Sequence, residues 1–62
     1  MEITKGTVIW FEDAETGEDV QAFVEFSGGD TITVYFPGRG LDTVHREDLT
    51  CWRGEFHGGK VF

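Results

Sequence analysis

Apolar and polar side chains alternate with a period of two residues along residues 20–26 and 31–36, and no other feature restricts the fold of this chain as strongly. Such alternation is typical of β-strands that bury one face. No segment carries helical spacing over a length that would predict an α-helix. In the first strand one face is expected to carry Val20, Ala22, Val24 and Phe26, and in the second strand one face is expected to carry Ile32, Val34 and Phe36.

Three more strands are expected at residues 7–11, 42–45 and 50–53, with short turns between the strands. Five short strands leave too few residues for a second sheet, and closure would remove the exposed edges of an open sheet. The sequence therefore predicts one all-β domain over residues 1–62, a small five-stranded SH3-like barrel. Residues 57–62 are expected to form a Gly-rich tail that either frays or packs against the barrel.

The small size of the chain limits how it can be stabilised. A chain of 62 residues buries only about 60% of the surface that its unfolded form exposes. Its one cysteine, Cys51, cannot form an internal disulfide, and no Cys/His spacing is typical of a zinc site. Stability must come from aromatic packing or from dimerisation, and the oligomeric state stays open. We expect Cys51 to be a small buried side chain and Trp52 to lie in the core or to cover the barrel.

The negative charge of the chain lies between Lys5 and Arg39, where there is no other Lys or Arg. The seven acids of this stretch account for the formal charge of −7, because the five acids and five bases outside it cancel. A surface of one sign attracts basic partners and repels phosphate. A basic protein is therefore the expected partner, and nucleic acid is not. The seven acids are Glu12, Asp13, Glu15, Glu18, Asp19, Glu25 and Asp30.

Several segments follow one another in a characteristic order. They are VIWFED at residues 8–13, VQAFV at 20–24, TITVYF at 31–36, glycines 38 and 40, Val44, and the Asp48–Leu49 pair. Over about residues 7–50, this order and spacing resemble the Tudor-like domains of the SH3-like barrel group. The resemblance implies a five-stranded barrel.

The same resemblance allows the aromatic cage of Tudor domains to be checked, since such cages hold methylated cations by cation–π attraction. Trp10 and Phe36 stand at two cage positions, whereas Val20 and Arg39 stand at or near two others. Leu41 replaces the polar residue that orients the ligand. The resemblance therefore implies the fold and not the binding of methyl-lysine or methyl-arginine.

Two shorter segments resemble cold-shock domains, which are OB-type barrels. These are KGTVIWF at residues 5–11 and Gly28–Asp30 with the alternating residues that follow. Residues 15–21 are acidic where that family has a basic and aromatic segment that stacks on bases. Because single-strand binding needs a positive groove, this function is the least favoured.

The acidic loop at residues 12–19 and several aromatic side chains are expected to bind a partner protein. The loop would steer a basic partner and the aromatic rings would provide apolar contacts. Alternatively, the loop is only solvated, and strand twist and the tail cover the rings. The predicted partner-binding residues are Trp10, Phe11, Glu12, Asp13, Glu15, Glu18, Asp19, Phe23, Tyr35 and Phe36.

The expected function is that of a non-catalytic adaptor or regulator. His45 and His57 have no Ser, Cys or Asp at a spacing typical of catalysis, and we expect no cofactor or metal. An alternative is an inhibitor of the kind made by phages or mobile elements, whose carboxylates occupy the nucleic-acid groove of a host enzyme. The chain has no signal peptide and no apolar run that spans a bilayer, so a cytoplasmic protein is expected.

Overall fold

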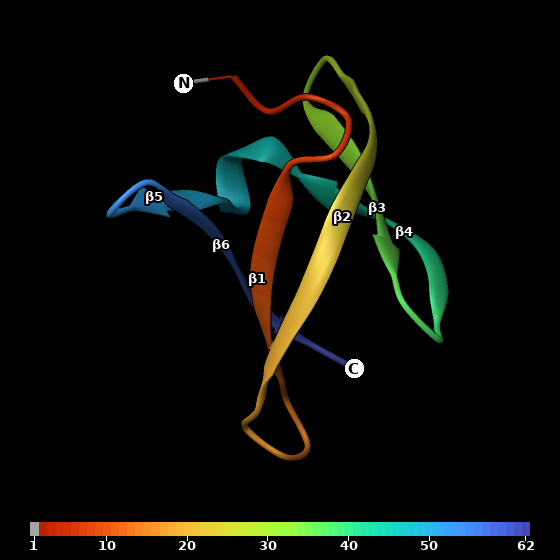
Figure 1. The fold of residues 1–62 in the computed structure, drawn as a ribbon, viewed down its shortest axis with the longest axis vertical. Helices are drawn as coiled ribbons and strands as arrows, with labels where there is room; N and C mark the ends of the chain where they lie inside the picture. Colours follow the sequence, from red (N-terminus) through yellow and green to blue (C-terminus); the bar gives the residue numbers. More distant parts are fainter. Residues whose placement is uncertain (1) are drawn as a thin grey trace.

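A computed structural model describes residues 2–62 and confirms that the chain is all-β, with no α-helix among these residues (Figure 1). β2 is the longest strand and forms hairpins with both β1 and β3. The elements are β1 (Val8–Asp13), β2 (Asp19–Gly28), β3 (Thr31–Phe36), β4 (Gly40–His45), the 3₁₀ turn η1 (Arg46–Asp48), β5 (Thr50–Trp52) and β6 (Glu55–Val61).

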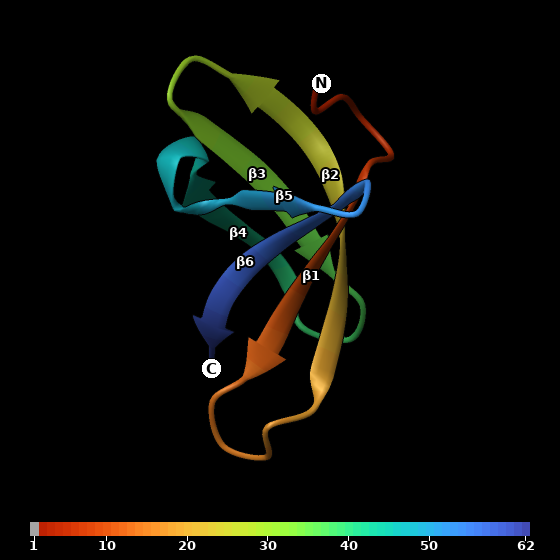
Figure 2. The same cartoon turned by 90° about the vertical axis from the view of Figure 1, so that its left-hand side faces the viewer.

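The strands form one curled sheet of six strands in the order β4-β3-β2-β1-β6-β5 (Figure 2). All neighbouring strands are antiparallel except β1 and β6, which are parallel. β4 and β5 lie at the two ends of the sheet, so the sheet is not closed. The sequence predicted five strands in a closed barrel, and the additional strand is β6.

Strand β6 occupies most of the segment expected to be a Gly-rich tail, and this segment packs against the rest of the sheet by pairing with β1. Arg53 and Gly54, with φ angles of 53° and 79°, connect Trp52 directly to its cross-strand neighbour Glu55. Two consecutive residues with positive φ give the kind of tight hairpin turn that matches strand twist. The chain then returns along β1, and the backbone N–H of Ala14 donates a hydrogen bond of 2.9 Å to the carbonyl of Val61.

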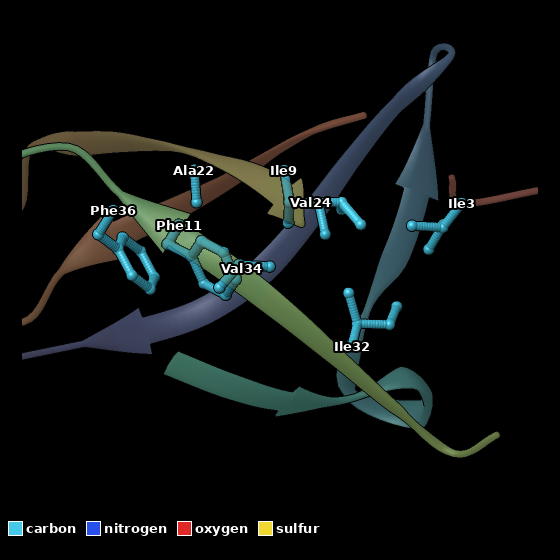
Figure 3. Packing of buried hydrophobic residues seen from close by; sticks show 8 residues of the cluster. All are labelled: Ile3, Ile9, Phe11, Ala22, Val24, Ile32, Val34 and Phe36. Carbon is cyan, nitrogen blue, oxygen red and sulfur yellow. The ribbon is translucent and has the colours of Figure 1, made fainter. Parts of the chain in front are cut away.

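The core lies on the concave side of the sheet and draws mainly on the alternating residues of β1, β2 and β3. Figure 3 shows these side chains in one cluster, with Ile3 at one end and Phe36 at the other. The rings of Phe11 and Phe36 pack at 5.2 Å between centroids. Burial of each large side chain stabilises the fold by about 1.5–3 kcal/mol. The cluster contains Ile3, Ile9, Phe11, Ala22, Val24, Ile32, Val34 and Phe36.

One irregularity in β2 changes which side chains face the core. Val24 pairs with Val34, but Phe26 pairs with Thr33, so the register shifts at Glu25. A bulge of this kind adds one residue to a strand and interrupts the alternation. Phe26 is therefore 67% exposed, and the prediction that it shares the core face with Val24 was wrong.

Two predictions for the C-terminal part were also wrong, because β5 is an edge strand with no layer above it. Cys51 is exposed. Trp52 is 61% exposed, and the guanidinium of Arg53 lies 4.6 Å from the centre of its ring. This stacking provides the Trp52 ring with a contact that does not depend on the core.

Candidate functional site

The acidic loop connects β1 and β2 and projects from one end of the molecule (Figure 1). Asp13 stabilises the conformation of this loop through hydrogen bonds to its backbone. Its Oδ1 accepts hydrogen bonds from the backbone N–H groups of Glu15 at 2.8 Å and Thr16 at 3.1 Å. Its own backbone N–H donates to the carbonyl of Glu18 at 2.8 Å, and its Oδ2 lies 3.7 Å from Nη2 of Arg39. Asp13 is buried, at 9% exposure, and therefore shapes the loop instead of presenting charge on its surface.

The other predicted acids of this hairpin face solvent. Glu12 pairs across the strands with Asp19, so two carboxylates stand side by side where the loop begins. Glu15 and Glu18 follow at its tip and are also exposed. Among residues 2–62, Asp13 is the only acid of the loop with a basic side chain within 4 Å. These four acids form the acidic end of the molecule: Glu12, Glu15, Glu18 and Asp19.

The convex face of the sheet carries a row of apolar side chains that crosses four strands. Val8 of β1 pairs with Phe23 of β2, and Phe23 pairs with Tyr35 of β3. Tyr35 in turn pairs with Leu41 of β4. Val8 and Phe23 are half-buried, whereas Tyr35 is 38% and Leu41 66% exposed. Because paired residues point to the same face, these four side chains form a continuous apolar strip, the convex row.

Trp10 connects the convex row to the acidic end. It is two residues beyond Val8 on the same face of β1, and its cross-strand neighbours are Gln21 and His57. A shallow hollow of about 180 Å³ beside it is lined by Trp10, Asp19, Glu55 and His57. Nε2 of His57 lies 3.8 Å from Oε1 of Glu55 and has no hydrogen-bond partner among residues 2–62. The half-buried indole of Trp10 is thus bordered by carboxylates.

The structure brings together only part of the predicted site. Phe11 and Phe36 are 4% and 1% exposed and lie in the core, so neither can act as a surface contact. For Phe11 the reason is the alternation of side chains along β1: Ile9 and Phe11 face the core, whereas Val8 and Trp10 face outward. Phe36 lies on the same buried face of β3 as Ile32 and Val34.

Two members of the convex row, Val8 and Leu41, were not predicted as site residues. Neither is aromatic or charged, and the sequence contains nothing that marks them individually. The pairing of β3 with β4 over six residues places Leu41 beside Tyr35. Only knowledge of this register could have identified the row.

Among residues 2–62, no group of three or more His, Cys, Asp or Glu side chains could hold a metal ion. The same part of the chain has no helix with the length and apolar character needed to cross a membrane.

Comparison with known proteins found no match among protein-family models, curated proteins or solved structures.

Proposed function

We propose that this protein is a non-catalytic interaction module that binds a basic partner protein through the convex row and the acidic end. The observation that carries the proposal is the in-register strip formed by Val8, Phe23, Tyr35 and Leu41, which ends in a side chain that is 66% exposed. Contiguous exposed apolar side chains with a polar border are typical of protein-binding surfaces.

The acidic end would orient the partner protein on this surface. Glu12 and Asp19 lie two strand positions beyond the Trp10–Gln21 pair, on the side of the sheet that carries the row. Charges at the border of an interface mainly accelerate encounter and align the partner, whereas the buried apolar centre provides most of the affinity. A partner with basic residues around an apolar patch satisfies both parts of the surface.

The proposal includes a Tudor-like fold of the SH3-like barrel group and a cytoplasmic location. The order of four antiparallel strands, a 3₁₀ turn and a further short strand supports this fold. The buried position of Phe36 leaves Trp10 as the one predicted cage aromatic at the surface. We therefore propose protein binding without recognition of a methylated side chain.

The proposal is tested by capture of partners from lysate of the source cell, with Leu41→Ser and Tyr35→Ser as the variants. We expect each to weaken binding of the captured protein about tenfold, equivalent to about 1.4 kcal/mol. Trp52→Ser is the matched control, because it also removes an exposed ring but lies on the opposite edge strand. Equal binding by all three variants and the wild type would exclude the convex row.

A second candidate function is inhibition of a nucleic-acid-binding enzyme by mimicry of phosphates. The observation that favours it is the acidic end, where four exposed acids have no basic side chain within ion-pairing distance in residues 2–62. DNA or RNA should displace such an inhibitor from its target. A module that binds beside the nucleic acid would remain bound.

A further inference from the structure

The hollow beside Trp10 is of a size that suits one side chain of a partner protein. Its volume of about 180 Å³ is below the roughly 300–1,000 Å³ typical of pockets for small molecules. Three strands contribute its lining: Trp10 comes from β1, Asp19 from β2, and Glu55 and His57 from β6. The hollow lies between the convex row and the acidic end, where a partner bound to both would cover it.

The two carboxylates of the hollow lie on different sides of the Trp10 indole. Trp10 pairs with Gln21 of β2 and with His57 of β6. Asp19 and Glu55 each stand two residues before one of these neighbours, so both are diagonal neighbours of Trp10 on the same face. Because β2 is antiparallel and β6 parallel to β1, Asp19 lies toward the C-terminal end of β1 and Glu55 toward its N-terminal end.

Neither of these carboxylates is paired with a strong base of the described chain. No Lys or Arg side chain of residues 2–62 lies within 4 Å of Asp19 or Glu55. Nε2 of His57 is 3.8 Å from Oε1 of Glu55, which is too long for a hydrogen bond. Both acids are exposed and remain available to a cation of a partner.

Arginine stacks on an aromatic ring at two other places in this molecule. The guanidinium carbon of Arg39 lies 3.9 Å from the centre of the Phe62 ring, and that of Arg53 lies 4.6 Å from the Trp52 ring. No Lys or Arg of residues 2–62 stacks on Trp10, the second tryptophan. A cation over an aromatic face is attracted by the ring quadrupole, and most strongly over tryptophan.

We propose that the hollow receives an arginine side chain of the basic partner, stacked on Trp10 with its N–H groups directed to Asp19 and Glu55. The guanidinium is planar and carries five N–H donors along its edges, so it can stack and reach two carboxylates at once. The ammonium of lysine is compact and strongly hydrated, and it fits this arrangement less well. The inference rests on the proposed function, because it names the side chain that would anchor the basic partner.

The hollow favours arginine without methyl groups. It contains one aromatic ring, whereas recognition of methylated cations depends on a cage of several rings. Methylation of arginine keeps the charge but removes N–H donors that the two carboxylates require. A dimethylated arginine should therefore bind more weakly than the unmodified side chain.

The test is a titration of the ¹⁵N-labelled protein with the end-blocked tripeptide Gly-Arg-Gly. We expect saturable shifts of the Trp10 indole N–H and of the amides of Asp19 and Glu55, with a Kd of about 1 mM. The same peptide with neutral citrulline in place of arginine should bind at least about tenfold more weakly. Peptides with lysine or dimethylarginine should each bind about threefold more weakly or less tightly still.

The first pair of variants tests the carboxylates. Asp19→Asn combined with Glu55→Gln should weaken binding of the arginine peptide about tenfold or more. Asp30→Asn combined with Glu47→Gln is the matched control, because it makes the same change in net charge at exposed acids outside the hollow. This control should leave the binding of the peptide unchanged.

The second pair of variants tests the ring. Trp10→Leu should weaken binding of the arginine peptide about fivefold or more, because the stacking surface is lost. Trp52→Leu is the matched control, since it removes the tryptophan on which Arg53 already stacks. Amide spectra of the unbound variants show whether each is folded. The carboxylate variants decide the question if Trp10→Leu does not fold.

The peptide titration and the capture experiment can fail separately. If the peptide does not bind but Leu41→Ser still weakens the captured partner, the arginine site is excluded and the convex row remains. If the peptide binds but Leu41→Ser and Tyr35→Ser do not weaken the partner, the convex row is excluded and the arginine site remains.

Four results would overturn the inference. They are the absence of saturable binding, equal binding of the citrulline peptide, equal binding of the lysine peptide, and equal effects of the hollow variants and their controls. Tighter binding of the dimethylarginine peptide would indicate recognition of a methylated side chain and would also overturn it.

Discussion

Neighbouring acids of the loop have different roles because strand alternation and turn geometry orient them differently. Asp13 is the last inward-facing residue of β1, so its carboxylate reaches the backbone of the loop that follows. Glu12 points to the other face and remains in solvent. A row of like charges in a sequence can therefore contain one structural residue, and in this loop it is Asp13.

The first prediction concerns Asp13. Asp13→Ala removes the acceptor for two backbone N–H groups, and we expect the free energy of unfolding to fall by about 1–2 kcal/mol. Asp13→Asn keeps an oxygen acceptor and loses only the charge next to Arg39, whose side chain is 54% exposed. An ion pair with such an exposed partner contributes little, so Asn should cost less than about 1 kcal/mol. Chemical denaturation of both variants measures the difference, and equal losses for Ala and Asn would contradict it.

Among the strands, those with regular alternation were predicted well from the sequence. Residues 31–36 coincide with β3, and the Ser27–Asp30 segment contains the turn between Gly28 and Thr31. The bulge at Glu25 was not predictable, because nothing in that residue indicates that the partner strand will skip it.

The sixth strand was missed for a different physical reason. Its turn places Arg53 at a φ of 53°, a conformation more typical of Gly, Asn or Asp. The sequence Arg-Gly therefore did not indicate a hairpin. Gly58 and Gly59 are also unusual inside a strand, and the parallel pairing of β6 with β1 leaves no local pattern in the sequence.

The second prediction concerns the contact between β6 and the core. A Cβ atom at Gly58 would overlap the ring of Phe11, which is buried against Phe36 and cannot move outward. Gly58→Ala should therefore lower the free energy of unfolding by about 1–3 kcal/mol through overpacking. Gly59→Ala is the matched control, since a Cβ there meets no atom within 4 Å. Thermal unfolding should separate the two variants, and equal midpoints would show that Gly58 does not position β6.

At the scale of the whole molecule, the position of the charges matters more than their sum. The molecule extends 30 × 26 × 17 Å, whereas charges are screened over about 8 Å at an ionic strength of about 0.15 M. The field of the acidic end therefore acts mainly on a partner that approaches this end. Asp30 lies in the turn between β2 and β3, at the other end of β2 from the acidic loop, Glu2 borders a hollow with Ser27 and Arg46, and Glu47 lies in η1.

The third prediction compares two triple variants with the same change in net charge. Replacement of Glu15, Glu18 and Asp19 by Lys should slow association with the captured partner about tenfold or more at low salt, because steering by a local field raises association rates. The matched variant replaces Glu2, Asp30 and Glu47 by Lys and should slow association much less. Rapid-mixing kinetics at about 0.02 M and about 0.15 M salt should show the difference shrinking as screening increases. If both triple variants slow association equally, the partner responds to net charge alone, and the acidic end has no directing role.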